Sequence, residues 1–249
     1  MKRYGWLLGC CLFLSMGMLW AADEPDLRML QQKAAQSRDM EGYVGVCKYL
    51  YQTEENPELL LLYADSIHQL ATKSKKPEQL VEYYIWASEG NFIKGDFQQG
   101  YALKRKAIAL AEKAGLKFAI SQSCCDMGYY CNVDARYDSA RYYFRKGLEA
   151  GEDLSEAGEA CRTMLTNYAS SFLFEGKTDS ALVYTIRASE RSAADKDTAM
   201  LIENLNQLGT IYRRKKDLEN CIANFEQALH LCELRGNHNA VAFIYGNIA

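Results

Sequence analysis

Hydrophobic residues recur along most of the chain at the spacing of one helix face, and nowhere in the strict alternation of a half-buried strand. The clearest stripe follows the i, i+3, i+4, i+7 rule of an amphipathic helix and consists of Cys124, Met127, Gly128 and Cys131. All three prolines lie in the first third of the chain, so residues 78–249 contain no strong helix breaker. These patterns predict an all-α protein.

Short turn signals separate the periodic segments and set the expected helix ends. Gly95 and Gly176 suit tight turns, and Gly115 and Gly236 suit helix C-termini. Helices are therefore expected at residues 26–38, 40–53, 57–73, 78–94, 97–114, 117–134, 137–150, 154–175, 179–193, 197–215, 218–235 and from 238 onward.

The helices repeat as pairs. A small residue opens the second helix of each pair, with spacings of 40, 41 and 40 between Gly100, Ala140, Ala181 and Cys221. A second set of small residues lets the two helices of a pair approach closely, at Gly128, Ala169 and Gly209. Self-similarity at this period predicts a solenoid, in which each repeat buries its apolar face against its neighbours.

The best repeat carries Leu208-Gly209, Tyr212, Phe225 and Ala228. This pattern resembles the tetratricopeptide repeat (TPR) family, and the resemblance implies a right-handed α-solenoid of antiparallel helix pairs with about five TPR-like repeats. The chain departs from the family in period, about 40 rather than about 34, and in lacking the usual proline near the repeat end. Both departures indicate long helices, similar to those in extracytoplasmic TPR regions of bacterial signalling proteins.

Three segments are expected. Residues 1–22 form a targeting segment, residues 23–79 form degenerate helical repeats, and residues 80–249 form the TPR solenoid. Because Ala249 stands one full repeat after Gly209, the sequence runs into a sixth repeat, and we expect further sequence downstream to complete the function.

Residues 1–22 have the order of a secretory signal peptide. Lys2 and Arg3 precede an uncharged run over residues 5–20, and Ala21-Ala22 leads into an acidic stretch. The run is short of the roughly 20 apolar residues that a membrane helix needs, although an uncleaved anchor stays open as an alternative. The chain is thus expected to be exported, either periplasmic or membrane-tethered and facing the periplasm.

Composition narrows the function classes. The formal net charge is −3 and becomes more negative once Lys2 and Arg3 are removed, so no basic face for nucleic acid is expected in this segment. Seven cysteines remain after the targeting segment, an odd number without a C-x-x-C pair. We interpret most of them as small buried residues.

No catalytic or metal-binding constellation is evident. None of the histidines, His68, His230 and His238, has a ligand partner at helical spacing. The glycine pair Gly90 and Gly95 mimics a phosphate loop but lacks the lysine and hydroxyl residue that would follow. The sequence predicts a protein that is not an enzyme and takes no cofactor.

A binding surface is implied by the resemblance, because the first helices of TPR pairs line a concave groove. Carried over by position, the groove residues are Gln122, Cys125, Tyr129 and Asn132, then Thr163, Thr166, Ser170 and Leu173, then Glu203, Asn206, Thr210 and Arg213. A merely solvated groove is the alternative. The paired lysine and asparagine residues of chaperone-binding relatives are not reproduced, and the basic run 213–216 fits a helix C-terminus better than a lipid or acidic-partner site.

The expected function is therefore a non-enzymatic interaction module that binds a protein or peptide. The role that we expect first is the extracytoplasmic sensor or input part of a bacterial signalling or transcription-regulatory protein. A free-standing periplasmic adaptor for protein assembly is the alternative. An enzyme would need a further domain downstream.

Overall fold

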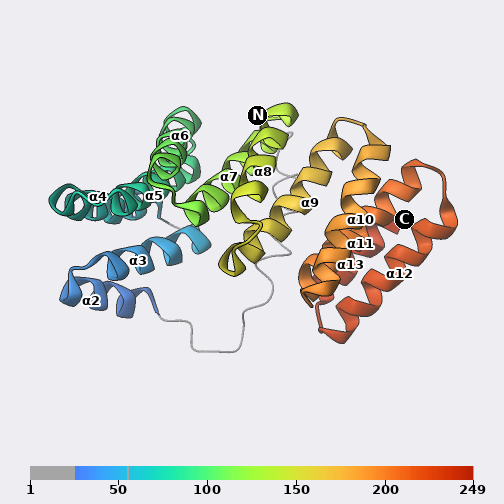
Figure 1. Ribbon diagram of the computed structural model, residues 1–249. Coiled ribbons are helices and arrows are strands. Elements are labelled where there is room, and N and C mark those ends of the chain that lie inside the picture. The colour runs from blue at the N-terminus through green and yellow to red at the C-terminus, as the bar shows by residue number, and fades with distance from the viewer. Residues whose placement is uncertain (1–25, 55, 249) are drawn as a thin grey trace. The chain divides into compact units, whose positions relative to one another are not determined.

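The computed structural model describes residues 26–54 and 56–248, and the packing of these residues divides them into two units, 26–127 and 128–248. Each unit is a stack of α-helices, and the described residues contain no strand (Figure 1). The all-α fold class is confirmed. The targeting segment expected at residues 1–22 lies outside the described residues.

Unit 26–127 is built from consecutive helices that pack on their sequence neighbours. These are α2 (Leu27–Ser37), α3 (Met40–Thr53), α4 (Pro57–Ser74), α5 (Pro77–Lys94), α6 (Phe97–Ala114) and the first part of α7 (Lys117–Val133). Side-chain oxygens of Asp39, Asn56 and Asp96 accept hydrogen bonds from backbone N–H groups in the first turns of α3, α4 and α6, which fixes where these helices begin.

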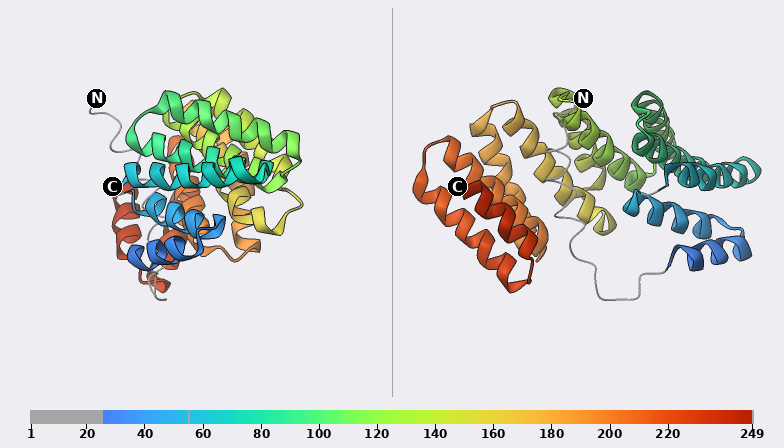
Figure 2. Two further views of the ribbon diagram at one scale, coloured as in Figure 1. Left: turned by 90° about the vertical axis from the view of Figure 1, so that its left-hand side faces the viewer. Right: turned by 180° about the vertical axis from the view of Figure 1, so that it is seen from behind.

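Unit 128–248 is built in the same way (Figure 2). It contains the end of α7, then α8 (Tyr137–Gly151), the 3-10 turn η1 (Ser155–Ala157), α9 (Gly158–Phe174), α10 (Thr178–Ala194), α11 (Thr198–Arg214), α12 (Leu218–Leu234) and α13 (His238–Ile248). The expected helix bounds agree to within one or two residues, except that α9 begins at Gly158 rather than at residue 154. The expected boundary between degenerate helical repeats (residues 23–79) and the TPR solenoid (residues 80–249) stays a prediction.

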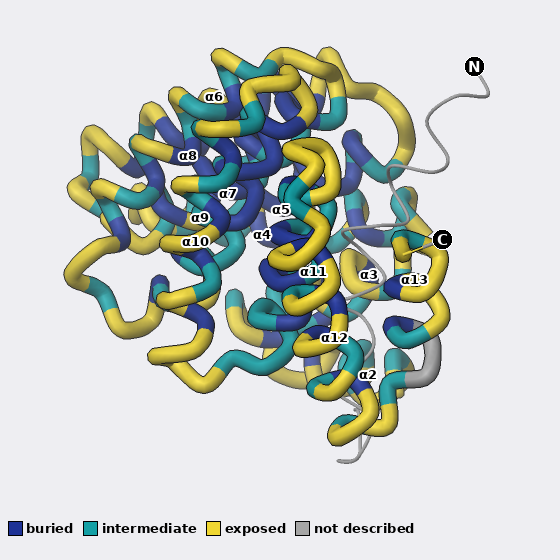
Figure 3. The backbone as a smooth tube through the Cα atoms, turned by 90° about the vertical axis from the view of Figure 1, so that its right-hand side faces the viewer, coloured by how far each residue is buried: buried dark blue, intermediate teal, exposed yellow. Residues whose placement is uncertain are grey.

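Close helix approach depends on small residues, as the repeat pattern predicts. A Cβ at Gly128 would lie 2.3 Å from Cε1 of Phe144, and one at Gly209 would lie 2.7 Å from Cε1 of Phe225. In the repeat between them the small residue is Ala169, and the position of the two phenylalanines is taken by Thr185. Each repeat thus fills the contact with a matched pair of residues, and the buried side of each helix faces its neighbours (Figure 3).

Left-handed backbone conformations end the first helix of each pair. Gly95 and Gly176 adopt φ angles of 87° and 82°, as the turn signals predict. Their equivalents in the other repeats are Ala135 and Lys216, with φ angles of 56° and 61°. An L-residue in this region is strained by about 1–2 kcal/mol, so these two turns are maintained by the packing around them rather than by residue choice.

One lysine is completely buried in unit 26–127, where the repeat pattern puts phenylalanine. Lys104 stands one repeat before Phe144, and its side chain has no exposed area. Its ammonium forms ion pairs with Glu89 of α5 and with Asp126 of α7, the latter with an Nζ–Oδ2 distance of 2.9 Å. Burial alone would lower the pKa of Lys104, but the charges of Asp126 and Glu89 more than offset this and hold the pKa above its ordinary value.

Candidate binding site

The structure buries several of the residues that the sequence assigns to a groove. Thr166 is 1% exposed, and its hydroxyl donates to Oδ1 of Asn204 on α11 across 2.9 Å. Ser170 is also buried, and its hydroxyl accepts from Nε2 of Gln207 across 2.7 Å. Both side chains therefore join α9 to α11, and neither is accessible to a ligand in this arrangement.

The same kind of bond joins other first helices of successive pairs. Asn132 of α7 is 8% exposed and donates from Nδ2 to the carbonyl of Asn167 across 3.0 Å. Asn206 accepts from Nδ2 of Asn247 on α13 across 2.8 Å, and Arg213 donates to the carbonyl of Asn247 across 2.6 Å. These bonds, together with those of Thr166 and Ser170, form a polar ladder between first helices that lie one repeat apart.

Seven of the twelve predicted groove residues keep exposed or half-exposed side chains, namely Gln122, Tyr129, Thr163, Glu203, Asn206, Thr210 and Arg213. Gln122 is exposed in unit 26–127, whereas Tyr129, Thr210 and Arg213 belong to unit 128–248. Tyr129 packs edge-on against Tyr130, with ring centroids 5.5 Å apart. Ligand binding by these residues stays a prediction.

Glu203 of α11 is half-buried, and the pKa of its carboxyl group is raised. Desolvation by burial, with a smaller contribution from the negative charge of Asp197, raises the pKa of Glu203 to about 7. A raised pKa means that the native state holds this proton between pH 4.5 and about 7 while the unfolded chain has already released it. This group therefore stabilises the fold less as the pH rises through that window, and least above it.

Replacing Glu203 with glutamine is expected to remove this loss. The variant should match the native protein near pH 4.5 and be more stable at pH 8 by about 1–2 kcal/mol, after discounting the pKa shift for the partial exposure of the side chain. Urea unfolding of both proteins at several pH values measures the difference. A difference that does not change with pH would contradict the assignment.

A pocket lies on the opposite side of α9. Its residues on this helix are Gly158, Cys161, Leu165 and Tyr168. At about 100° per residue, this stripe is on the other side of the helix from Thr166 and Ser170. It faces the second helices α8 and α10. The pocket holds about 350 Å³, within the lower range of ligand sites.

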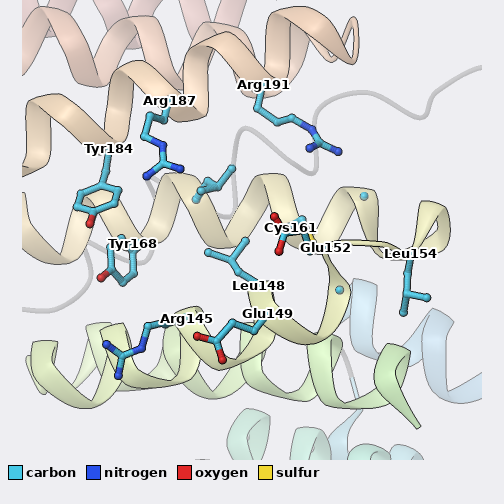
Figure 4. A pocket seen from close by; sticks show the side chains of 13 residues that line it. Arg145, Leu148, Glu149, Glu152, Leu154, Cys161, Tyr168, Tyr184, Arg187 and Arg191 are labelled. Carbon is cyan, nitrogen blue, oxygen red and sulfur yellow. The ribbon is translucent and has the colours of Figure 1, made fainter. Parts of the chain in front are cut away.

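We call this cavity the α9 pocket. Besides the α9 stripe it is lined by residues of α8, of the following connection and of α10, namely Arg145, Leu148, Glu149, Gly151, Glu152, Leu154, Tyr184, Arg187 and Arg191. Figure 4 shows Arg145, Tyr168, Tyr184 and Arg187 at one end, with Glu152, Leu154 and Arg191 toward the other. Glu149 lies next to Arg145 in the same view, so this end of the cavity combines two arginines and two tyrosines with one carboxylate.

The connection between α8 and α9 explains why the pocket forms there. Residues 152–157 separate these helices and include the turn η1, whereas only two residues separate α6 from α7 and three separate α10 from α11. The repeat spacing is 41 across this connection and 40 elsewhere. The longer connection lines one end of the space between α8 and α10.

The two tyrosines of the pocket contact each other, and Tyr168 keeps its phenol proton at neutral pH. The rings of Tyr168 and Tyr184 meet edge to face with centroids 4.7 Å apart, and the two side chains share a hydrogen bond. Burial raises the pKa of the Tyr168 phenol, and the neighbouring Tyr184 raises it further. Both features keep the Tyr168 hydroxyl protonated.

The arginines of the pocket differ in whether they are paired. Arg191 is bound to Asp195, with an Nε–Oδ2 distance of 2.8 Å. Arg187 lies over the ring of Tyr184, 5.9 Å from its centroid, and neither Arg187 nor Arg145 forms an ion pair among the described residues. The two guanidinium groups without an ion pair therefore lie beside the two tyrosines.

An adjoining hollow of about 460 Å³ shares Arg191 and Glu152 with the pocket, and its arginines are paired. Arg162 pairs there with Asp195 and with Asp197, at 3.1 and 2.8 Å. These pairs tie α9 to the turn between α10 and α11. Among the residues that line the two spaces, the unpaired positive charge is thus confined to the Arg145 and Arg187 end.

Sequence reasoning missed this pocket. It assigned binding to the other side of α9 and gave no role to Arg145 or Arg187. Two signals were present: the longer repeat spacing across the α8–α9 connection, and the tyrosine Tyr168, which stands one repeat before the core residue Leu208. Within residues 26–54 and 56–248, no cluster of side chains suits a metal ion, and no helix is long and apolar enough to cross a membrane.

Comparison with known proteins supports the fold. No protein-family model matches the chain, and no curated protein matches it significantly. Among solved structures, BtubC (BKLC) from P. vanneervenii is 14% identical with a TM-score of 0.68, covering 85% of this chain and 89% of that chain. The apo form of RapI is 9% identical with a TM-score of 0.66, covering 88% of this chain and 64% of that one.

A further similar structure is Bacillus thuringiensis PlcR in complex with the peptide PapR7 and DNA. It is 13% identical with a TM-score of 0.54, and the alignment covers 89% of this chain and 85% of that chain. The present chain spans less than two thirds of RapI. At these identities the likeness concerns the fold, and it confirms the TPR-type helical repeat that the residue pattern predicts.

Proposed function

We propose that this chain is a non-enzymatic protein-interaction module and that the α9 pocket receives a segment of its partner. The observation that carries the proposal is the placement of two arginines without ion pairs beside two tyrosines over an apolar floor. Tyrosine and arginine are the residue types that most often anchor protein interfaces. The similar structure of PlcR contains a bound peptide, which is consistent with this use of the fold.

The partner is a peptide or protein rather than a small metabolite. The pocket is open at the Arg145 and Arg187 end, because both side chains are exposed, so an occupant can continue onto the surfaces of α8 and α10. A pocket of about 350 Å³ holds one or two side chains of such a segment.

The first test is a selection from a displayed library of random peptides. Peptides selected on the native chain should lose at least tenfold in affinity when Arg145 and Arg187 are both changed to alanine. The matched control is Arg105→Ala with Lys106→Ala. It removes two positive charges from α6, at the repeat positions that correspond to Arg145 and Arg187. If the selected peptides bind the pocket variant and the control equally well, the pocket is not the interaction site.

The cellular role that we propose is the extracytoplasmic input part of a bacterial signalling protein. This role rests on the signal-like segment 1–22 and on the resemblance to long-helix TPR regions. A fusion of the full chain to a phosphatase that is active only after export should be active. An inactive fusion, with the fusion protein present at a normal level, would contradict export.

The alternative role is a free-standing periplasmic adaptor for protein assembly. The coding sequence after codon 249 separates the two roles. A frame that continues into a membrane span and an effector region supports the signalling role, whereas an amphipathic capping helix followed by a stop supports the adaptor.

A further inference from the structure

We propose that the α9 pocket selects a carboxylate of the partner, supplied by a glutamate or aspartate side chain. This inference rests on the proposed interaction function and adds the chemistry of the occupant. It concerns the side of α9 that faces α8 and α10. The sequence assigns binding to the other side, where Thr166 and Ser170 lie.

The positive charge is placed to hold an anion from two sides. Arg145 comes from α8 and Arg187 from α10, and both line the same cavity. Neither forms an ion pair with the described residues, so their charge is available to a ligand. A guanidinium presents two parallel N–H donors that match the geometry of a carboxylate.

The tyrosines add a donor at the same end of the pocket. The hydrogen bond between Tyr168 and Tyr184 uses one of their two phenol protons, which leaves one hydroxyl of the pair to donate to an oxyanion. Figure 4 shows both phenol groups on the side of the pocket where Arg145 and Arg187 lie. The two tyrosines lie between Arg187 on one side and Arg145 on the other, so a carboxylate bound beside the phenol groups would have a guanidinium group on either side of it.

The floor of the pocket suits the methylene groups that carry such a carboxylate. Leu148 and Leu165 are half-buried, and Cys161 is 8% exposed. These apolar surfaces would cover the stem of a glutamate or an adjacent aliphatic side chain. A small, strongly hydrated anion without an apolar part gains nothing from them.

Two glutamates favour a monoanion over a phosphate. Glu149 and Glu152 also line the pocket, and neither forms an ion pair with the described residues. Their charges oppose a second negative charge on the ligand, since like charges brought together in a partly desolvated site are strongly unfavourable. A carboxylate carries one charge and a phosphate at neutral pH carries nearly two.

The inference is tested on the peptides selected from the displayed library. They should be enriched in glutamate or aspartate, and a synthetic, C-terminally amidated copy with the acidic residue changed to its amide should bind at least tenfold more weakly. A copy with phosphoserine at that position should not bind more tightly, and millimolar inorganic phosphate should not compete. Equal binding of the acid and amide peptides would overturn the carboxylate assignment.

A charge-reversed variant gives a second readout. The same library selected on Arg145→Glu with Arg187→Glu should enrich lysine and arginine instead of acidic residues. Both positions are exposed, so circular dichroism should show an unchanged helical signal. Selection of acidic peptides by this variant would also overturn the assignment.

The two proposals fail in different ways. If no selected peptide depends on Arg145 and Arg187, the interaction function of the pocket is wrong. If the peptides depend on these arginines but tolerate the amide, the interaction stands and only the carboxylate chemistry is wrong. If binding requires a free peptide C-terminus, the pocket recognises the terminal carboxylate. That result would overturn the assignment to a glutamate or aspartate side chain.

Discussion

Changing Lys104 to methionine lowers the free energy of unfolding of unit 26–127 by an expected value of about 3–5 kcal/mol, the cost of breaking a buried ion pair by removing one partner. The loss does not come from packing volume, because methionine is similar in length to lysine. It comes from Glu89, whose side chain is 3% exposed and would lose the Lys104 ammonium that pairs with its buried charge. Asp126 is less affected, because 24% of its side chain is exposed.

Urea unfolding followed by tryptophan fluorescence measures this effect. Trp86 lies in α5, on the same helix as Glu89, and is the only tryptophan in residues 26–249. The control is Lys113→Met, an exposed lysine of the same helix as Lys104, which should change stability by less than about 0.5 kcal/mol. Equal effects of the two substitutions would show that the buried charge is not essential.

A double variant separates charge from shape. Glu89→Gln combined with Lys104→Met removes both buried charges, so we expect it to recover at least half of the loss. Buried ion pairs replaced by neutral residues are often no less stable than the original, which supports this expectation. A double variant as unstable as the single one would place the loss in packing.

Changing Gly128 to alanine should cost about 3 kcal/mol, at the upper end of overpacking effects. The new methyl group would lie 2.3 Å from Cε1 of Phe144. Phe144 has no exposed area, so its ring cannot turn out into solvent to make room. The helices α7 and α8 would have to separate, and their contacts along the whole interface would weaken.

Two other glycines provide matched controls within helices. A Cβ at Gly246 meets nothing within 4 Å, and one at Gly45 approaches only Cδ2 of Leu30, at 3.9 Å. Gly45→Ala should therefore stabilise α3 by about 0.5–1 kcal/mol, because alanine favours helix more than glycine does. Thermal unfolding of the three variants should rank Gly128→Ala lowest and Gly45→Ala highest.

The clash also predicts a coupling. Phe144→Leu shortens the side chain that the new methyl group would meet, so the double variant should lose less than the sum of the two single losses. The repeat formed by α9 and α10 already combines an alanine at this position with a smaller partner, since Ala169 is matched by Thr185 rather than by phenylalanine. Strict additivity would contradict a direct clash.

Much of the fold could be predicted from the sequence because its determinants are local or periodic. Helix bounds depend on capping residues and glycines that stand at each end, and the small residues Gly128 and Gly209 mark the close contacts. The start of α9 was the exception. The turn η1 occupies residues that continue the helical pattern, so periodicity alone did not separate them from α9.

The site was much less predictable, because burial of a polar side chain is a tertiary property. Thr166 and Ser170 look like groove residues in the sequence, yet their hydrogen-bond partners lie 38 and 37 residues away. Nothing near them in the chain reveals these partners. Arg145 and Arg187 pose the opposite problem, since they look like solvated helix residues in the sequence and are brought to one cavity only by the packing of α8 and α10.

Lys104 is marked in the sequence by its position in the repeat. Aligned by repeat, its position is held by Phe144, Thr185 and Phe225, so a lysine there is out of place. A buried cation requires an acidic partner, and both Glu89 and Asp126 lie within about half a repeat of it. Comparison of repeats position by position would have predicted a buried charged cluster.

The hydrogen bonds from α11 to the preceding helix pair, α9 and α10, make the repeats of this chain non-interchangeable. Asn204 uses its oxygen for Thr166 and its amide for Ser192, while Gln207 joins Ser170 to Thr185. Every partner belongs to the preceding repeat and has its own geometry. Excising residues 158–197 would bring α11 next to α8 and leave both amides without these partners in a buried interface. Such a deletion keeps the helical period but should not fold, so the array cannot be shortened or shuffled at this point as a uniform repeat protein can.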